Sequence, residues 1–138
     1  MKPSERGDRT EAVVLAALAK AGYTILIPFG VARYDIAIDA RNGSGIKTVQ
    51  CKTGSLYRGC IIFRAHSIDH ATQVRRHYRG QADYFGVWCP DFADNIYLIP
   101  VEDVGPSTVA LRVTPVKNGQ IKGIRWAEDY EVKNVGSE

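Results

Sequence analysis

Three polar residues stand where the sequence predicts the interior of a β-sheet. Asp35 lies in Tyr-Asp-Ile-Ala-Ile-Asp, and Gln50 and Lys52 are two residues apart in Val-Gln-Cys-Lys. Residues at i and i+2 of a strand point to one face, so Cys51 points to the other. Charges are rarely buried in a sheet unless they are paired or bound to a metal. The three residues therefore indicate either a metal-dependent site or a structural ion pair between Asp35 and Lys52.

A fourth polar residue, Glu11, is predicted to lie on a helix. Val14, Leu15 and Leu18 follow it by three, four and seven positions, which is the spacing of one helical face. The Glu11 carboxylate then lies on or beside the stripe that faces the sheet, where it needs a cation or hydrogen-bond donors. The alternative is a first-turn glutamate that interacts with the helix N-terminus.

The elements that position these residues follow from hydrophobic periodicity and turn residues. Asn42-Gly43 is typical of a hairpin turn between the strands of Asp35 and Lys52. The order of the elements indicates an α/β or α+β chain with a mixed sheet. We expect helices over Arg9–Ala21 and Asp69–Tyr78, one helical turn over Val101–Val104, and strands over Tyr23–Phe29, Arg33–Asp39, Ile46–Lys52, Cys60–Ala65, Asp83–Cys89, Asn95–Pro100 and Val109–Thr114.

Composition places the chain among globular proteins. With 138 residues, of which 45% are hydrophobic and 24% charged, we expect one domain over residues 1–138. No apolar run approaches the roughly 18 residues that span a bilayer, so we expect no membrane partner. The N-terminus lacks the apolar core of a signal peptide, and the three cysteines have no CxxC spacing. These features predict a cytoplasmic protein with reduced thiols.

Positive charge is concentrated in the middle of the chain. The net charge is +3, yet residues 52–80 hold six Lys or Arg residues against the single acid Asp69. Such a segment indicates a polyanion as partner, although a charged run can also be an ordinary solvated surface. The candidate nucleic-acid contacts are Tyr57, Arg58, Arg64, Arg75, Arg76, Tyr78 and Arg79, each of which could instead be a surface residue without a contact.

Taken together, the polar residues resemble the active-site pattern of the PD-(D/E)XK nuclease superfamily. That pattern is a helical Glu, an Asp on a strand, and (Glu/Asp/Gln)-x-Lys on the next strand of the hairpin. The runs Ala-Arg-Tyr-Asp-Ile-Ala-Ile-Asp, Val-Gln-Cys-Lys-Thr-Gly and Asp-Tyr-Phe-Gly-Val-Trp-Cys-Pro are similar to the small endonucleases associated with group I introns. The resemblance covers roughly residues 7 to 130. It implies an α/β restriction-endonuclease-like core, αβββαβ, with a mixed central sheet flanked by helices.

The sequence departs from the superfamily pattern at two positions. Tyr34 replaces the Pro before the Asp, a change that matters little because this Pro is often absent. Gln50 replaces the acidic residue of (D/E)xK, which removes one negative charge from the site. A Gln amide oxygen still binds a hard cation, though less strongly than a carboxylate, and the intron-associated relatives also carry Gln there.

The resemblance implies phosphodiester hydrolysis that depends on Mg²⁺, with Mn²⁺ as a substitute. Asp35 would bind the metal directly, Gln50 would contribute its side-chain oxygen, and Cys51 its backbone carbonyl. Glu11 would bind a metal or a metal-bound water from the helix side. Lys52 would orient the attacking water and stabilise the transition state. The Cys51 thiol should point into the core and take no part.

We therefore predict a metal-dependent DNA endonuclease that cuts both strands at a specific site, as homing endonucleases do. Double-strand cleavage is most simply achieved by a homodimer, or by a homotetramer built from dimers. Two alternatives remain: a Holliday junction resolvase acting on branched DNA, and a DNA-binding module that has lost catalysis. Gln50 disfavours the resolvase, which usually carries Glu there. The intact set of Glu11, Asp35 and Lys52 opposes the inactive module.

Overall fold

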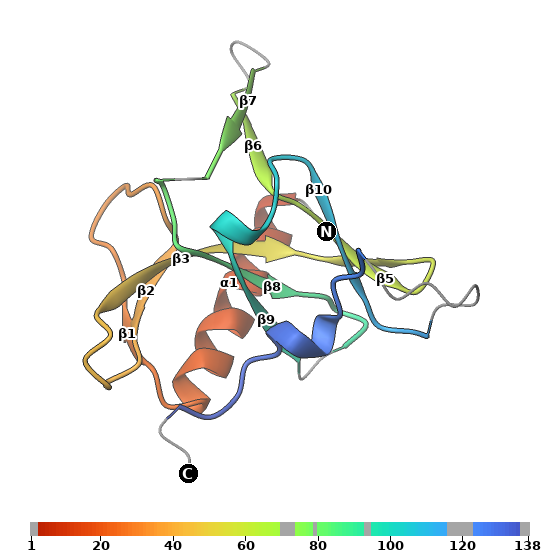
Figure 1. The fold of residues 1–138 in the computed structure, drawn as a ribbon. Coiled ribbons are helices and arrows are strands. Elements are labelled where there is room, and N and C mark those ends of the chain that lie inside the picture. Colours follow the sequence, from red (N-terminus) through yellow and green to blue (C-terminus); the bar gives the residue numbers. More distant parts are fainter. Residues whose placement is uncertain (1–2, 70–73, 79, 93–94, 116–122, 136–138) are drawn as a thin grey trace.

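A computed structural model describes residues 3–69, 74–78, 80–92, 95–115 and 123–135 (Figure 1). A five-stranded mixed sheet lies at the centre, in the order β1-β2-β3-β8-β9. A long helix, α1, packs on one of its faces, and a three-stranded sheet in the order β10-β5-β4 packs on the other. The predicted mixed α/β class is confirmed. Within the described residues, no helix has both the length and the apolar character needed to cross a membrane.

Helix α1 spans Pro3–Lys20 and begins one and a half turns earlier than predicted. Proline is well accepted in the first turn of a helix, because the N–H that it lacks has no intrahelical partner there. Val14 and Leu18 are fully buried against the central sheet. Close approach depends on Gly86, where an added Cβ would lie 2.9 Å from methyl groups of both Val14 and Val49. This contact places Val14, in the second half of α1, above the middle of the sheet.

The central sheet contains the predicted strands, of which β3 is one residue longer than expected and the other four are shorter. Their bounds are Thr24–Leu26 for β1, Ile36–Asp39 for β2, Ile46–Thr53 for β3, Tyr84–Trp88 for β8 and Ile96–Pro100 for β9. All neighbours are antiparallel except β3 and β8, which run parallel with Cys51 opposite Gly86. Strand β2 begins opposite Val49, so the second half of β3 extends beyond it. That extension carries Gln50 and Lys52.

The smaller sheet contains one strand that the sequence did not reveal. The sheet is built from β4 (Ser55–Tyr57), β5 (Cys60–Arg64) and β10 (Thr108–Arg112), and β4 is the strand that was not predicted. A short 3₁₀ turn, Ala127–Tyr130, follows later in the chain. Arg58 and Gly59 join β4 to β5, and both have positive φ angles, 49° and 78°. Two-residue hairpins favour this conformation, but usually through Asn-Gly or Asp-Gly. Because Arg58 occupies the first position, the sequence lacks the usual signal for this turn.

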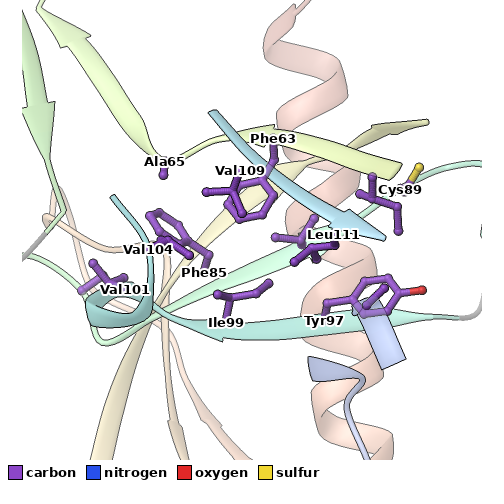
Figure 2. Packing of buried hydrophobic residues seen from close by; sticks show 14 residues of the cluster. Phe63, Ala65, Phe85, Cys89, Tyr97, Ile99, Val101, Val104, Val109 and Leu111 are labelled. Atoms are coloured by element: carbon purple, nitrogen blue, oxygen red, sulfur yellow. The ribbon is translucent and has the colours of Figure 1, made fainter. Parts of the chain in front are cut away.

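Between the two sheets lies the larger hydrophobic cluster (Figure 2). The rings of Phe63 on β5 and Phe85 on β8 meet edge to face, with centroids 5.5 Å apart. Ile99 and Leu111 are fully buried beside them. The predicted helical turn is present as a 3₁₀ turn, Val101–Asp103, which contributes Val101 to the same cluster. A buried apolar layer therefore supports the face of β3 and β8 that is opposite α1.

The helix predicted over Asp69–Tyr78 is wrong. The described residues form two antiparallel strands instead, β6 (His66–Asp69) and β7 (Val74–His77), with His66 opposite His77. The hairpin projects from the body of the molecule (Figure 1). Lys52 contacts both ends of this hairpin, through the carbonyl of His66 at the start of β6 and the hydroxyl of Tyr78 just after β7. A helix of ten residues would hold its ends about 15 Å apart, whereas a hairpin returns the chain to its starting point.

Candidate active site

The site is built where β2 begins. Asp35 donates its N–H to the carbonyl of Val49 at 3.1 Å, yet the residue registered with Val49 is Ile36. Two successive residues thus oppose one residue of β3, which is the arrangement of a β-bulge. Bulges end regular pairing and redirect a side chain. Here the redirected side chain is the carboxylate of Asp35.

Asp35 is held against the open edge of β3. Its Oδ2 accepts the N–H of Cys51 at 2.8 Å. If β2 began earlier, this N–H would instead form a backbone hydrogen bond to β2. The N–H and C=O of one strand residue point to the same side. The Cys51 carbonyl is therefore directed toward the side on which Asp35 lies. A carboxylate and a backbone carbonyl share this edge.

Glu11 reaches the site from α1 and is half-buried. Burial raises the pKa of its carboxyl, and the negative charges of Asp35 and Asp8 raise it further. The helix is fixed here by Thr10, whose hydroxyl is 2.6 Å from the hydroxyl of Thr53 at the end of β3. Thr10 is only 1% exposed. The buried pair sets the position of Glu11 relative to β3.

Asp35 has a raised pKa as well. Burial is the main cause, and the Cys51 N–H and the charge of Lys52 only partly offset it. Two carboxylates therefore lie near each other in a partly desolvated place, where the charge of Lys52 offsets the effect of burial on Asp35 only in part. This is the environment that a divalent cation neutralises. The residues present fit a hard metal ion.

Lys52 is fixed by partners other than the carboxylates. Its Nζ donates to Tyr78 Oη at 3.1 Å and to the His66 carbonyl at 3.2 Å, and it lies 4.6 Å from the centre of the Tyr78 ring. Among the described residues, no ion pair joins Lys52 to Asp35. The alternative in which Asp35 and Lys52 form a simple structural pair is not what the structure contains.

Gln50 and Cys51 lie on opposite faces of β3. Gln50 is half-buried and shares the face of Phe85 and Lys52. The Cys51 side chain packs against the cluster beneath α1, as predicted, and burial raises the pKa of its thiol. In the described part of the chain, no three His, Cys, Asp or Glu side chains group as metal ligands. A metal here would depend on two carboxylates with amide and carbonyl oxygens.

The expected DNA contacts are spread over three segments. Tyr57 and Arg58 form the exposed β4–β5 turn, where the guanidinium lies 5.2 Å from the ring centre. Arg64 is exposed at the end of β5. Arg75 and Arg76 belong to β7, and Arg79 lies outside the described residues. Tyr78, by contrast, is half-buried and directs its hydroxyl to Lys52.

Sequence reasoning did not find the residues that support the site. Thr10 lies four positions before Val14, on the buried stripe of the helix, and this spacing could have indicated it. The sequence could not indicate the role of the His66 carbonyl, because every residue has a backbone carbonyl. Tyr78 was identified by type, but its role was assigned to DNA rather than to Lys52.

Known nucleases resemble this chain in fold. The chain resembles the structure of a bacterial homing endonuclease, I-Ssp6803I, with a TM-score of 0.73 and 20% identity, over 95% of this chain and 89% of that one. An Archaeoglobus fulgidus Holliday junction resolvase, Hjc, aligns with a TM-score of 0.47 and 22% identity, over 78% and 84%. No curated protein matches the sequence. The family model described as PD-(D/E)XK endonuclease matches residues 1–133. The chain belongs to the PD-(D/E)XK endonuclease family.

Proposed function

We propose that this chain is a divalent-metal-dependent DNA endonuclease whose active site is Glu11, Asp35, Gln50 and Lys52. One observation carries the proposal. Two carboxylates with raised pKa values lie close enough for the charge of Asp35 to act on Glu11, and the Lys52 ammonium group is anchored independently of them. A structural ion pair would have joined Lys52 to Asp35 and left no need for a cation.

Four oxygen donors would hold the metal: the carboxylates of Asp35 and Glu11, the amide oxygen of Gln50 and the carbonyl of Cys51. This all-oxygen set suits Mg²⁺, and Mn²⁺ should substitute for it. A bound metal of this type supplies charge neutralisation at the phosphate and a more acidic water. Asp35 keeps one oxygen for the metal, because among the described residues only its Oδ2 is hydrogen-bonded.

Lys52 acts on the scissile phosphate. An ammonium group has three N–H donors, and two of them are directed to Tyr78 and to the His66 carbonyl. The third is available for the attacking water or for a phosphate oxygen that gains negative charge in the transition state. The two fixed contacts hold the group in position before the substrate arrives.

The substrate is duplex DNA, cut at a specific site on both strands by a homodimer or homotetramer. The basic residues of the middle segment would contact the phosphate backbone, with Arg also able to read guanine. The proposed contacts are Tyr57, Arg58, Arg64, Arg75, Arg76 and Arg79. We reassign Tyr78 to Lys52, because its hydroxyl is directed to that ammonium.

The test is cleavage of a DNA panel by purified protein with Mg²⁺ or Mn²⁺. The panel contains supercoiled plasmid, long linear duplex and a four-way junction, and EDTA serves as the metal control. Lys52→Ala should abolish cleavage, whereas Lys47→Ala, an exposed lysine on the same strand, should not. Preference for the junction would favour a resolvase. DNA binding without cleavage by any metal would favour an inactive binding module and contradict the proposal.

A further inference from the structure

Lys52 draws both of its hydrogen-bond partners from one element. His66 is the first residue of β6, and Tyr78 directly follows His77, the last residue of β7. The backbone register pairs His66 with His77. The base of the projecting hairpin (Figure 1) therefore closes over the Lys52 ammonium.

Tyr78 is anchored without help from Lys52. Its ring meets Phe85 edge to face, with centroids 5.4 Å apart and an interplanar angle of 89°. Its carbonyl accepts the N–H groups of Gln81 at 2.8 Å and Ala82 at 3.0 Å. Phe85 is fully buried in the cluster between the two sheets. The phenol is thus a fixed support that extends from the core toward the flexible lysine side chain.

Two properties of the phenol suit a cation. Its oxygen lies 3.1 Å from Nζ and accepts one N–H, and the ring centre lies 4.6 Å from the same nitrogen. An ammonium over an aromatic face is attracted by the ring quadrupole. Lysine has four rotatable side-chain bonds and loses considerable entropy when it is fixed. The fixed phenol of Tyr78 therefore determines the position of the Lys52 ammonium group.

We propose that Tyr78 is a positioning residue for catalysis, which acts through Lys52 and does not contact the substrate. The inference rests on the proposed nuclease function. It assigns the β6–β7 hairpin a second role besides DNA contact, because its base holds the Lys52 ammonium in a fixed position. Movement of the hairpin on DNA would be transmitted to Nζ through the two contacts.

The test separates positioning from substrate binding. Tyr78→Phe keeps the ring and its packing on Phe85 but removes the oxygen that Lys52 meets. We expect kcat for plasmid cleavage to fall about tenfold or more, since small misplacement of a catalytic group is costly. KM and the affinity for duplex DNA should be unchanged. Tyr130→Phe, in a half-buried tyrosine packed against the same cluster, is the matched control and should keep full activity.

A second measurement does not depend on activity. Urea unfolding midpoints are compared for the parent chain, Tyr78→Phe, Lys52→Met and the double variant. If the phenol acts through Lys52, then Tyr78→Phe lowers the midpoint in the parent chain but has little effect in the Lys52→Met background. Equal losses in both backgrounds would overturn the inference.

Two further outcomes discriminate. Weaker DNA binding by Tyr78→Phe with unchanged kcat would make Tyr78 a substrate contact and overturn the positioning role. A parent chain that cuts no DNA would instead contradict the proposed function, which the cleavage panel detects before any Tyr78 variant is made. An active parent with unaltered Tyr78→Phe kinetics contradicts this inference alone.

Discussion

Gln50 gives the proposed site one negative charge fewer than an acidic residue at this position would. Replacing it with Glu would add a third carboxylate beside Asp35 and Glu11, whose pKa values are already raised. We expect Gln50→Glu to lower the Mg²⁺ concentration needed for half-maximal cleavage by roughly three- to tenfold. The metal-free protein should become less stable, because like charges repel. Titrating cleavage against Mg²⁺, with exposed Gln81→Glu as control, checks both expectations.

The raised pKa of Asp35 also predicts how stability depends on pH. A carboxyl with a higher pKa in the folded chain binds protons more tightly there than in the unfolded chain. Ionisation of Asp35 therefore costs stability, and this cost appears as the pH rises from the ordinary value of 3.8 through the raised pKa. The metal-free protein should lose this part of its free energy of unfolding across the weakly acidic range.

Asp35→Asn isolates that contribution. Asn keeps an oxygen for the Cys51 N–H but carries no charge. We expect the variant to be inactive, yet more stable than the parent chain at neutral pH when EDTA is present. Urea unfolding from about pH 4 to about pH 7 should show a smaller loss of stability with pH for the variant. The prediction would be contradicted if the parent chain became more stable relative to Asp35→Asn as the pH rises.

At the residue scale, the sequence indicated the proposed reacting groups better than the residues that support them. Asp35, Gln50 and Lys52 were evident because polar residues interrupted apolar strands. The partners of Lys52 were not, because the bond to His66 uses a backbone carbonyl and the bond to Tyr78 spans 26 positions. Such contacts follow from tertiary structure and have no periodic signature.

At the scale of elements, errors arose where local pattern and tertiary contact disagree. The segment from Asp69 to Tyr78 contains polar residues with an intermittent apolar stripe, which suits a helix. In the structure β7 pairs with β6 instead, and Tyr78 returns to the side of His66 at Lys52. Strand β2 was expected to start at Arg33, yet the bulge at Asp35 delays regular pairing until Ile36. That departure from a regular strand is what presents the carboxylate.

The attachment of α1 to β3 can be tested at Thr10. Thr10→Val keeps the shape of the side chain but leaves the hydroxyl of Thr53 without its partner, 2.6 Å away in the parent chain. We expect a loss of about 1–3 kcal/mol in the free energy of unfolding and reduced cleavage, since Glu11 is the next residue. Exposed Thr108→Val is the control in urea denaturation. Equal stability of both variants would contradict a role for the hydroxyl pair.

The loop between β1 and β2 exposes apolar side chains next to the site. Phe29 and Val31 are fully exposed and Ile27 is 69% exposed. Arg33, the only charged residue from Ile27 to Tyr34, lies 5.7 Å from the Tyr34 ring. Apolar side chains beside Arg are typical of wedges that enter the minor groove. The loop leads directly to Asp35, so DNA at the active site would lie close to it.

We therefore expect Phe29→Ser with Val31→Ser to weaken duplex DNA binding about tenfold. The unfolding midpoint should not fall, because neither side chain is buried. The matched control is Ile46→Ser, which alters an exposed apolar residue at the far end of β3. Fluorescence anisotropy with labelled duplex measures the affinity. Unchanged affinity together with a change in sedimentation would show that the loop joins copies of the chain instead.

At the scale of the molecule, one sequence provides one set of Asp35, Gln50 and Lys52. Two antiparallel DNA strands present two scissile phosphates, so a double-strand cut requires two sets or a second binding event. Two chains related by a twofold axis would match the symmetry of the duplex. We therefore expect the active species to be a dimer or a tetramer.

Mixing active and inactive chains tests that expectation directly. Lys52→Ala chains refolded with a small amount of the parent chain should form mixed oligomers with one working site. Those oligomers should convert supercoiled plasmid to nicked circles, whereas the parent chain alone should release linear DNA. In the control experiment the concentration of the parent chain is held constant while more Lys52→Ala protein is added. If each chain acts alone, the ratio of nicked to linear product should not change. The product ratio thus reports how many copies of the Lys52 site cooperate on one duplex.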